Sequence, residues 1–112
     1  EVRLWSYESK RFESTGLQFC GLIMGDHSKS GINTMFNTGT VVGVSANVYG
    51  AGFPRNFIAS FTWGGPQGTM EYKLDKAIDT AHRMMQRRGL AVDEVENEIL
   101  QAVYEQTAGY RR

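Results

Sequence analysis

Several residue types are scarce in this chain, and each scarcity excludes a class of protein. A single cysteine, Cys20, excludes an internal disulfide and predicts a reducing, cytoplasmic environment. No apolar run approaches the length of a membrane-spanning helix, so no membrane partner is predicted. Lys plus Arg equals Asp plus Glu at 12 each, which excludes a basic field for nucleic acid. Glycine is plentiful instead, with 13 residues, and this is typical of a turn-rich β architecture.

Residues 24–53 read as five consecutive copies of a six-residue unit. A period of six fits neither a helix nor a hairpin, and it predicts a parallel β-helix in which each unit is one short strand and one turn. The first and fifth residues of each unit are expected to point inward, as strand alternation requires. The first positions are Met24, Ser30, Phe36, Val42 and Val48, and the fifth are Ser28, Thr34, Thr40, Ala46 and Gly52. Glycine or asparagine in second place suits a sharp corner.

The sixth residue of each unit stands between the fifth residue and the first residue of the next unit, so it is expected to point outward. These outward residues sort onto three faces. The faces pair Lys29 with Asn47, Ile23 with Val41, and Met35 with Phe53. Two of these rows are apolar, and exposed apolar patches usually mark an interface. We therefore expect one row to pack against the C-terminal helices and the other against a neighbouring subunit.

The flanking segments predict strands and two helices. Residues 1–7 alternate as a strand does, residues 8–15 read as an exposed charged turn, and residues 56–63 predict a further extended segment. A loop over 64–68 precedes a helix from about residue 69 to 88. Asp93 and Glu96 predict a capping box for a second helix to about residue 107. The chain thus divides into β coils over 1–68 and a helical hairpin over 69–112, packed together as one domain.

The six-residue unit resembles the hexapeptide repeat of the left-handed β-helix acyltransferases. Residues 21–65 resemble more closely the C-terminal domain of bacterial putative sugar nucleotidyltransferases, which are similar to the bifunctional N-acetylglucosamine-1-phosphate uridyltransferase/glucosamine-1-phosphate acetyltransferase. The resemblance covers roughly residues 15–110. It implies a left-handed coil and assembly into homotrimers. The expected fold class is therefore mainly β, a left-handed parallel β-helix capped or flanked by an α-helical hairpin.

The resemblance also implies acetyl or acyl transfer from acetyl-CoA to an amino sugar or nucleotide sugar. In that family a histidine takes the acceptor's proton, so His27 is the candidate base and Asp26 the candidate orienter. The alternative for His27 is a solvated or interface histidine. Lys29 and Arg55 are candidate contacts for phosphates, against the alternative of ordinary surface charges.

Other reactive residues have simpler explanations. The family's catalytic histidine precedes a Gly-Asp pair resembling Gly25-Asp26, and Cys20 stands roughly there in this chain. A lone cysteine in an apolar run is more often core than nucleophile. His82 falls beside an apolar helix stripe, which favours a surface role. Two histidines do not provide the three that a γ-type carbonic anhydrase needs, so no metal is predicted.

Two functions remain open at this stage. The chain begins with Glu1 and carries fewer than two coils of repeat, so we expect a fragment of a longer protein. It lacks the GxGxRL-like signature of nucleotidyl transfer, which places that activity elsewhere. The first prediction is a transferase module, inactive as an isolated fragment. The alternative is a non-enzymatic trimerisation and regulatory scaffold for an upstream nucleotidyltransferase domain.

Overall fold

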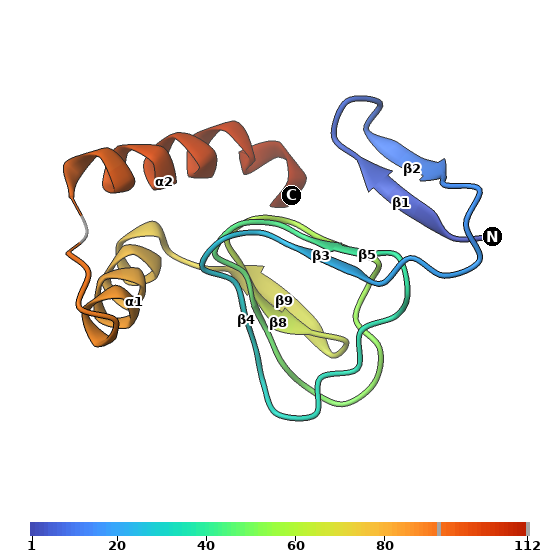
Figure 1. The fold of residues 1–112 in the computed structure, drawn as a ribbon, viewed down its shortest axis with the longest axis horizontal. Coiled ribbons are helices and arrows are strands. Elements are labelled where there is room, and N and C mark those ends of the chain that lie inside the picture. The colour runs from blue at the N-terminus through green and yellow to red at the C-terminus, as the bar shows by residue number, and fades with distance from the viewer. Residues whose placement is uncertain (92, 112) are drawn as a thin grey trace.

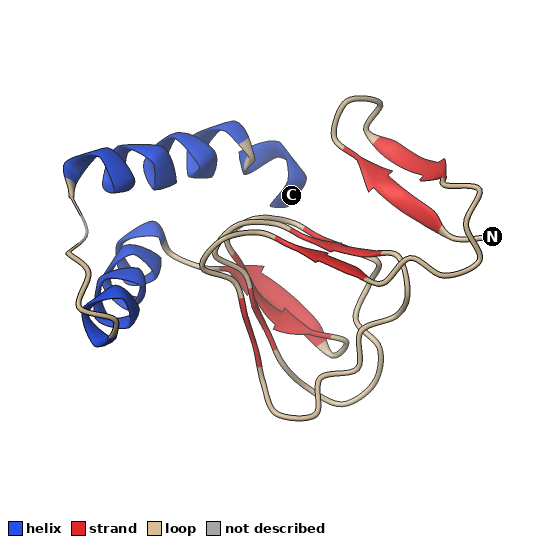
Figure 2. Cartoon of the chain, in the orientation of Figure 1, coloured by secondary structure: helices blue, strands red, loops and turns tan. Residues whose placement is uncertain are grey.

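A computed structural model describes residues 1–91 and 93–111 (Figure 1). Arg112, the last residue of the predicted helical segment, lies outside this range. The elements in chain order are β1 (Arg3–Ser6), β2 (Arg11–Ser14), β3 (Leu22–Met24), β4 (Lys29–Ser30), β5 (Thr40–Val42), β6 (Asn47–Val48), β7 (Phe57–Ile58), β8 (Thr62–Gly65), β9 (Gly68–Glu71), α1 (Leu74–Arg87), α2 (Glu94–Gln106) and the 3₁₀ helix η1 (Ala108–Arg111). The short strands lie between the two helices and the β1–β2 hairpin (Figure 2).

The predicted fold class, a left-handed parallel β-helix with flanking helices, is wrong. The chain is a small α+β protein with two helices and mixed sheets in its described part. β1 and β2 form an antiparallel pair, β3, β5 and β7 form a parallel sheet, and β4, β6, β8 and β9 form a sheet that ends in an antiparallel pair. A three-sided coil needs a third sheet, but residues 31–39 and 49–56 contain no strand. Asn33, Gly39, Gly50 and Gly52 adopt positive φ angles there, which interrupts extended backbone.

The strand register of the first two layers nevertheless matches two of the predicted rows, Ile23 with Val41 and Lys29 with Asn47. Leu22 lies opposite Thr40 and Lys29 opposite Asn47, an offset of 18 residues in both sheets. An offset of 18 residues equals three six-residue units. The next layer is shorter, since Val41 pairs with Phe57 after an offset of 16 residues. The pattern ends at Phe53-Pro54, as expected from the sequence.

The inward positions of the later units form the first core cluster. Val42, Ala46 and Val48 are almost fully buried, and Ile58 and Phe36 pack against them. The prediction for these positions is confirmed. The earlier inward position Met24 is not buried but 37% exposed. It lies on β3, the edge strand of its sheet, which has no outer partner among the described strands.

Glycine at the second position of a unit serves a different purpose from the one predicted. Gly25 and Gly43 are absent from the residues with positive φ. A Cβ at Gly25 would lie 2.7 Å from the Gly43 carbonyl oxygen, and a Cβ at Gly43 would lie 2.5 Å from Ser60 N. The corners of successive layers therefore stack so closely that no side chain fits between them.

Two predicted boundaries near the helices are wrong. The predicted loop over 64–68 and the first residues of the predicted helix form an antiparallel β8–β9 hairpin, with Gly65 opposite Gly68. Its turn has only two central residues, and Gly64 and Gly68 adopt positive φ. α1 therefore begins at Leu74, and the predicted domain boundary falls inside β9. The Asp93 cap is confirmed, since its side chain accepts from Glu96 N–H at 3.0 Å.

A second core cluster attaches the helices to the strands. Phe61, Ala77, Ala81 and Leu100 are buried together, and Val44 at a layer corner packs against them. Because both helices contribute to this cluster, the helical part and the strands share one core. No helix among the described residues has the length and apolar character needed to cross a membrane.

The N-terminal segment forms a hairpin that aromatic rings hold against the C-terminal end. The predicted strand over 1–7 is confirmed as β1, whereas residues 8–15, predicted as an exposed turn, include β2. The Trp5 ring stacks on Phe57 with centroids 4.4 Å apart, and Tyr110 meets Phe57 edge-on at 5.9 Å. Three segments far apart in the sequence are joined at this point.

Candidate functional site

The candidate base, His27, lies in the tight turn between β3 and β4. Its φ is 61°, and its side chain is only 10% exposed. His27 Nε2 lies 3.0 Å from Glu96 Oε1 in the first turn of α2. Nε2–H donates to this carboxylate, which can only accept, whereas Nδ1 is buried and has no hydrogen-bond partner among the described residues.

The candidate orienter, Asp26, is exposed and does not hydrogen-bond to His27 in the described part of the chain. Its backbone carbonyl accepts from Ser45 N–H at 2.9 Å, which joins two layers. The structure brings Glu96 to His27 instead. The sequence identifies Glu96 only as the partner of Asp93 at the start of the second helix. No sequence pattern links Glu96 to His27, which lies 69 positions earlier.

Lys29 lies close to His27 but supports the turn. Its Nζ donates to the His27 carbonyl oxygen at 3.2 Å. Burial lowers the pKa of Lys29, because the charged ammonium loses solvation. These contacts favour a structural role over the predicted contact with a phosphate.

Arg55 occupies a different part of the molecule. It lies on the loop before β7, is exposed, and forms no ion pair with any described residue. It lines a cavity of about 630 Å³ together with residues of the β8–β9 hairpin and η1. Among His27, Asp26, Lys29 and Arg55, only Arg55 lines this cavity. The predicted base His27 and the predicted phosphate contact Arg55 therefore do not line one cavity, although the other predicted contact, Lys29, lies beside His27.

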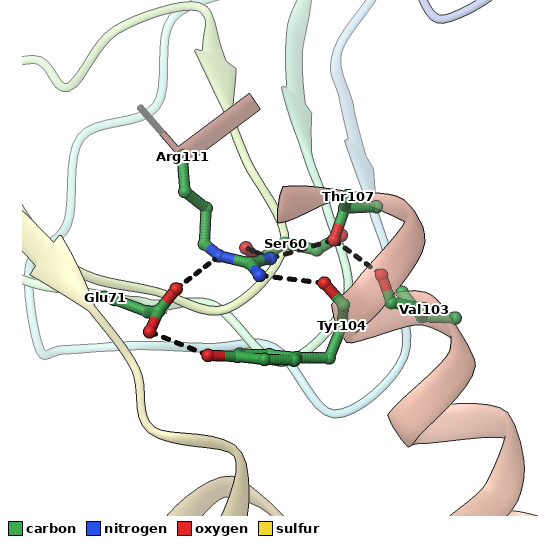
Figure 3. Close-up of polar contacts among 6 residues, drawn as sticks. All are labelled: Ser60, Glu71, Val103, Tyr104, Thr107 and Arg111. Atoms are coloured by element: carbon green, nitrogen blue, oxygen red, sulfur yellow. Dashed lines mark hydrogen bonds and ion pairs between the residues drawn. The ribbon is translucent and has the colours of Figure 1, made fainter. Parts of the chain in front are cut away.

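The structure contains a polar cluster that the sequence did not reveal (Figure 3). The Arg111 side chain is 4% exposed, and its Nε donates to Glu71 Oε2 at 2.9 Å. Its remaining nitrogens donate to the carbonyls of Ser60 and Tyr104 and to Thr107 Oγ1. This guanidinium thus joins β9, a layer corner and the end of α2. It stands near the C-terminal end without a periodic pattern, so no sequence signal identified it.

Tyr104 completes the cluster from the other side of the guanidinium. Its hydroxyl donates to Glu71 Oε1 at 2.7 Å, and its ring lies 4.3 Å from the Arg111 guanidinium carbon. The hydrogen bond to Glu71 raises the pKa of Tyr104, because ionisation would place two negative oxygens together. The network is compact and internally bonded, which is typical of a structural clamp.

The remaining candidates also have structural surroundings. Cys20 is half-buried, and its backbone N–H donates to Thr38 Oγ1 at 3.0 Å. His82 Nε2 lies 2.9 Å from Asn97 Oδ1, which links α1 to α2. The described residues hold no group of three His, Cys, Asp or Glu side chains that could bind a metal.

Comparisons with models of protein families, with curated proteins and with solved structures find no match. A function for this chain therefore has to be argued from its own geometry. Two features carry that argument: the enclosed position of His27 and the apolar residues that remain exposed on the turn segments.

Proposed function

We propose that this chain is a non-catalytic assembly module that joins three copies of itself and, through them, an upstream domain. The observation that carries the proposal is an exposed apolar surface on two adjacent turn segments. We call it the assembly face: Ile32, Met35, Tyr49 and Phe53. These side chains are 96%, 46%, 47% and 61% exposed. Contiguous exposed apolar side chains mark interaction surfaces more often than surfaces that remain in contact with solvent.

The two segments of the assembly face are held side by side. Gly31 N–H donates to the Val48 carbonyl at 2.8 Å, and a Cβ at Gly31 would lie 3.2 Å from Tyr49 Cβ. The second apolar row is covered only in part: Val41 is 6% exposed, whereas Ile23 is 52% exposed, and both line a hollow with Val103 of α2. Met35 and Phe53 are the row left for a neighbouring subunit. Three copies is the number that the sequence resemblance to hexapeptide proteins implies.

The surroundings of His27 support a non-catalytic role. A general base must lie within about 3 Å of the proton that it removes. His27 Nε2 is already bonded to Glu96, and Nδ1 is buried. The cavity beside Arg55 is not lined by this histidine.

Phe53→Asp should weaken assembly without unfolding the chain, because Phe53 is 61% exposed in the single subunit. Burying an unpaired carboxylate at an interface centre costs at least about 2 kcal/mol, so association should weaken by about 30-fold or more. Sedimentation equilibrium of wild type and variant over the same concentrations measures this change. Met70→Asp is the matched control, since Met70 is 68% exposed on β9, outside the assembly face.

The expected pattern is a trimer for wild type and for Met70→Asp and a smaller species for Phe53→Asp. Equal association constants for wild type, Met70→Asp and Phe53→Asp would show that the assembly face is not the contact surface. A wild-type chain that stays monomeric at every concentration would reject the proposal itself.

Acyl transfer from acetyl-CoA is the second candidate, and the His27–Glu96 pair favours it. A carboxylate 3.0 Å from a histidine nitrogen is the arrangement that orients a general base. In this case, release of the coenzyme A thiol in the presence of an amino sugar should fall by about 10²- to 10⁴-fold in His27→Ala. His82→Ala, which alters the other histidine bonded to α2, should retain the rate. Absence of thiol release by the wild type, or equal loss in both variants, would exclude His27 as the base.

A further inference from the structure

The cavity beside Arg55 has the dimensions of a small-molecule site. Its volume is about 630 Å³, and pockets for ligands commonly measure roughly 300–1,000 Å³. Phe57 and Pro66 supply apolar wall, whereas Thr69 of the β8–β9 hairpin supplies a polar group; Gln67 also lines the cavity, but its Nε2 donates to the Ala51 carbonyl at 2.8 Å. Tyr110 of η1 also lines it. Because three separate segments form the cavity, its shape depends on the completed fold.

Among the described residues, the guanidinium groups of Arg55 and Arg111 border this cavity, and Arg55 is the uncommitted one of this pair. Arg111 directs its donors to Glu71, Ser60, Thr107 and Tyr104. Arg55 is exposed and forms no ion pair or side-chain hydrogen bond with the described residues. The Arg55 guanidinium is therefore available to bind a ligand in a cavity whose wall is partly apolar.

We propose that this cavity binds a small molecule that carries an oxyanion, either phosphate or carboxylate, on a ring-sized apolar body. The planar guanidinium of Arg55 matches either oxyanion through two parallel hydrogen bonds. Phe57 and the exposed Pro66 contact the body of the ligand, and the Thr69 side chain contacts its polar edge. Phe53 lines the same cavity, so the site borders the assembly face.

Fragment titrations followed by ¹H–¹⁵N NMR test the site directly. The probes are phenyl phosphate, benzoate and phenol, which share a ring and differ in the charged group. We expect phenyl phosphate or benzoate to shift the amide signals of Gly64, Gly65 and Gly68, which line the cavity. Phenol should bind at least about tenfold more weakly, because it lacks the charge-assisted bonds. The better anionic probe identifies phosphate or carboxylate as the group.

Three variants separate Arg55 from a general effect of charge. Arg55→Gln should weaken the binding of the anionic probes by about tenfold or more. The affinity of Arg55→Lys should lie between those of Arg55→Gln and wild type, since lysine keeps the charge but lacks the planar pair of donors. Arg87→Gln is the control, because Arg87 is an exposed arginine of α1 that does not line the cavity. None of these variants should change the mass of the assembly.

The proposal is overturned by any of three results: no binding of either anionic probe, equal binding by wild type and Arg55→Gln, or signal shifts confined to residues outside the cavity. Equal affinity for phenol and the anionic probes would likewise reject an oxyanion site.

Discussion

Gly43→Ala is expected to lower the free energy of unfolding by about 2–3 kcal/mol, since overpacking at a closely packed position costs this much. The added Cβ would lie 2.5 Å from Ser60 N and 2.8 Å from Ser60 Cα. The Cβ would also clash with Ser60 Oγ, but two of its three nearest neighbours are backbone atoms of the next layer, so rotation of the Ser60 side chain alone does not relieve the clash. Ser60 is itself 3% exposed, and its Oγ accepts from Val44 N–H at 2.9 Å. Relief of the clash would therefore disturb a second bond at the same corner.

Urea unfolding followed by circular dichroism measures this effect, with both proteins at one concentration because assembly adds to apparent stability. Gly109→Ala is the matched control, since nothing lies within 4 Å of a Cβ built there and its φ is not positive. Its stability should stay within about 0.5 kcal/mol of wild type. Equal midpoints for the two variants would show that the layer corners are not closely stacked.

Arg111→Met is expected to cost about 3 kcal/mol, because it leaves buried acceptors without donors. The Ser60 and Tyr104 carbonyls and Thr107 Oγ1 each lose a partner within 3.2 Å. Glu71 is 47% exposed, so solvent replaces part of its lost ion pair and the charge itself contributes little. The cost should therefore come chiefly from the neutral acceptors.

The comparison for this prediction is Arg83→Met, which removes an arginine from an exposed pair. Arg83 Nε lies 3.2 Å from Asp79 Oδ2, and both side chains are more than half exposed. Such a pair contributes about 0.3–0.5 kcal/mol. Arg111→Lys should remain well below wild type, since an ammonium cannot supply the planar set of donors. Equal denaturation midpoints for Arg111→Met and Arg83→Met would contradict the clamp shown in Figure 3.

Periodicity predicted those parts of the fold that depend on regular spacing. The six-residue unit anticipated the offset between Leu22 and Thr40 and the burial of Val42 and Val48. It could not anticipate that residues 31–39 form turns, because Asn33 and Gly39 look equally acceptable at coil corners. The local pattern describes which side chains face inward, while the fold class depends on how many segments become strands.

Tertiary pairing explains the other errors. β2 and β9 carry charged or glycine-rich sequences, and each becomes a strand because a neighbouring strand supplies backbone hydrogen bonds. Pairing of His27 with Glu96 and of Arg111 with Glu71 joins residues 69 and 40 positions apart. Single-sequence patterns report local preference and carry no information on such contacts. Of the predicted site residues His27, Asp26, Lys29 and Arg55, only Arg55 lines the cavity beside the β8–β9 hairpin.

The most direct test of the assembly module is the oxidation rate of individual methionines in the wild-type chain, measured by mass spectrometry after brief exposure to hydrogen peroxide. In a single subunit Met35 and Met70 are 46% and 68% exposed, so their rates should differ by less than twofold. A covered assembly face predicts that Met35 reacts at least about tenfold more slowly than Met70 and becomes faster on dilution, as mass action dissociates the assembly. Rates that follow the exposures of the single subunit at every concentration would contradict the account.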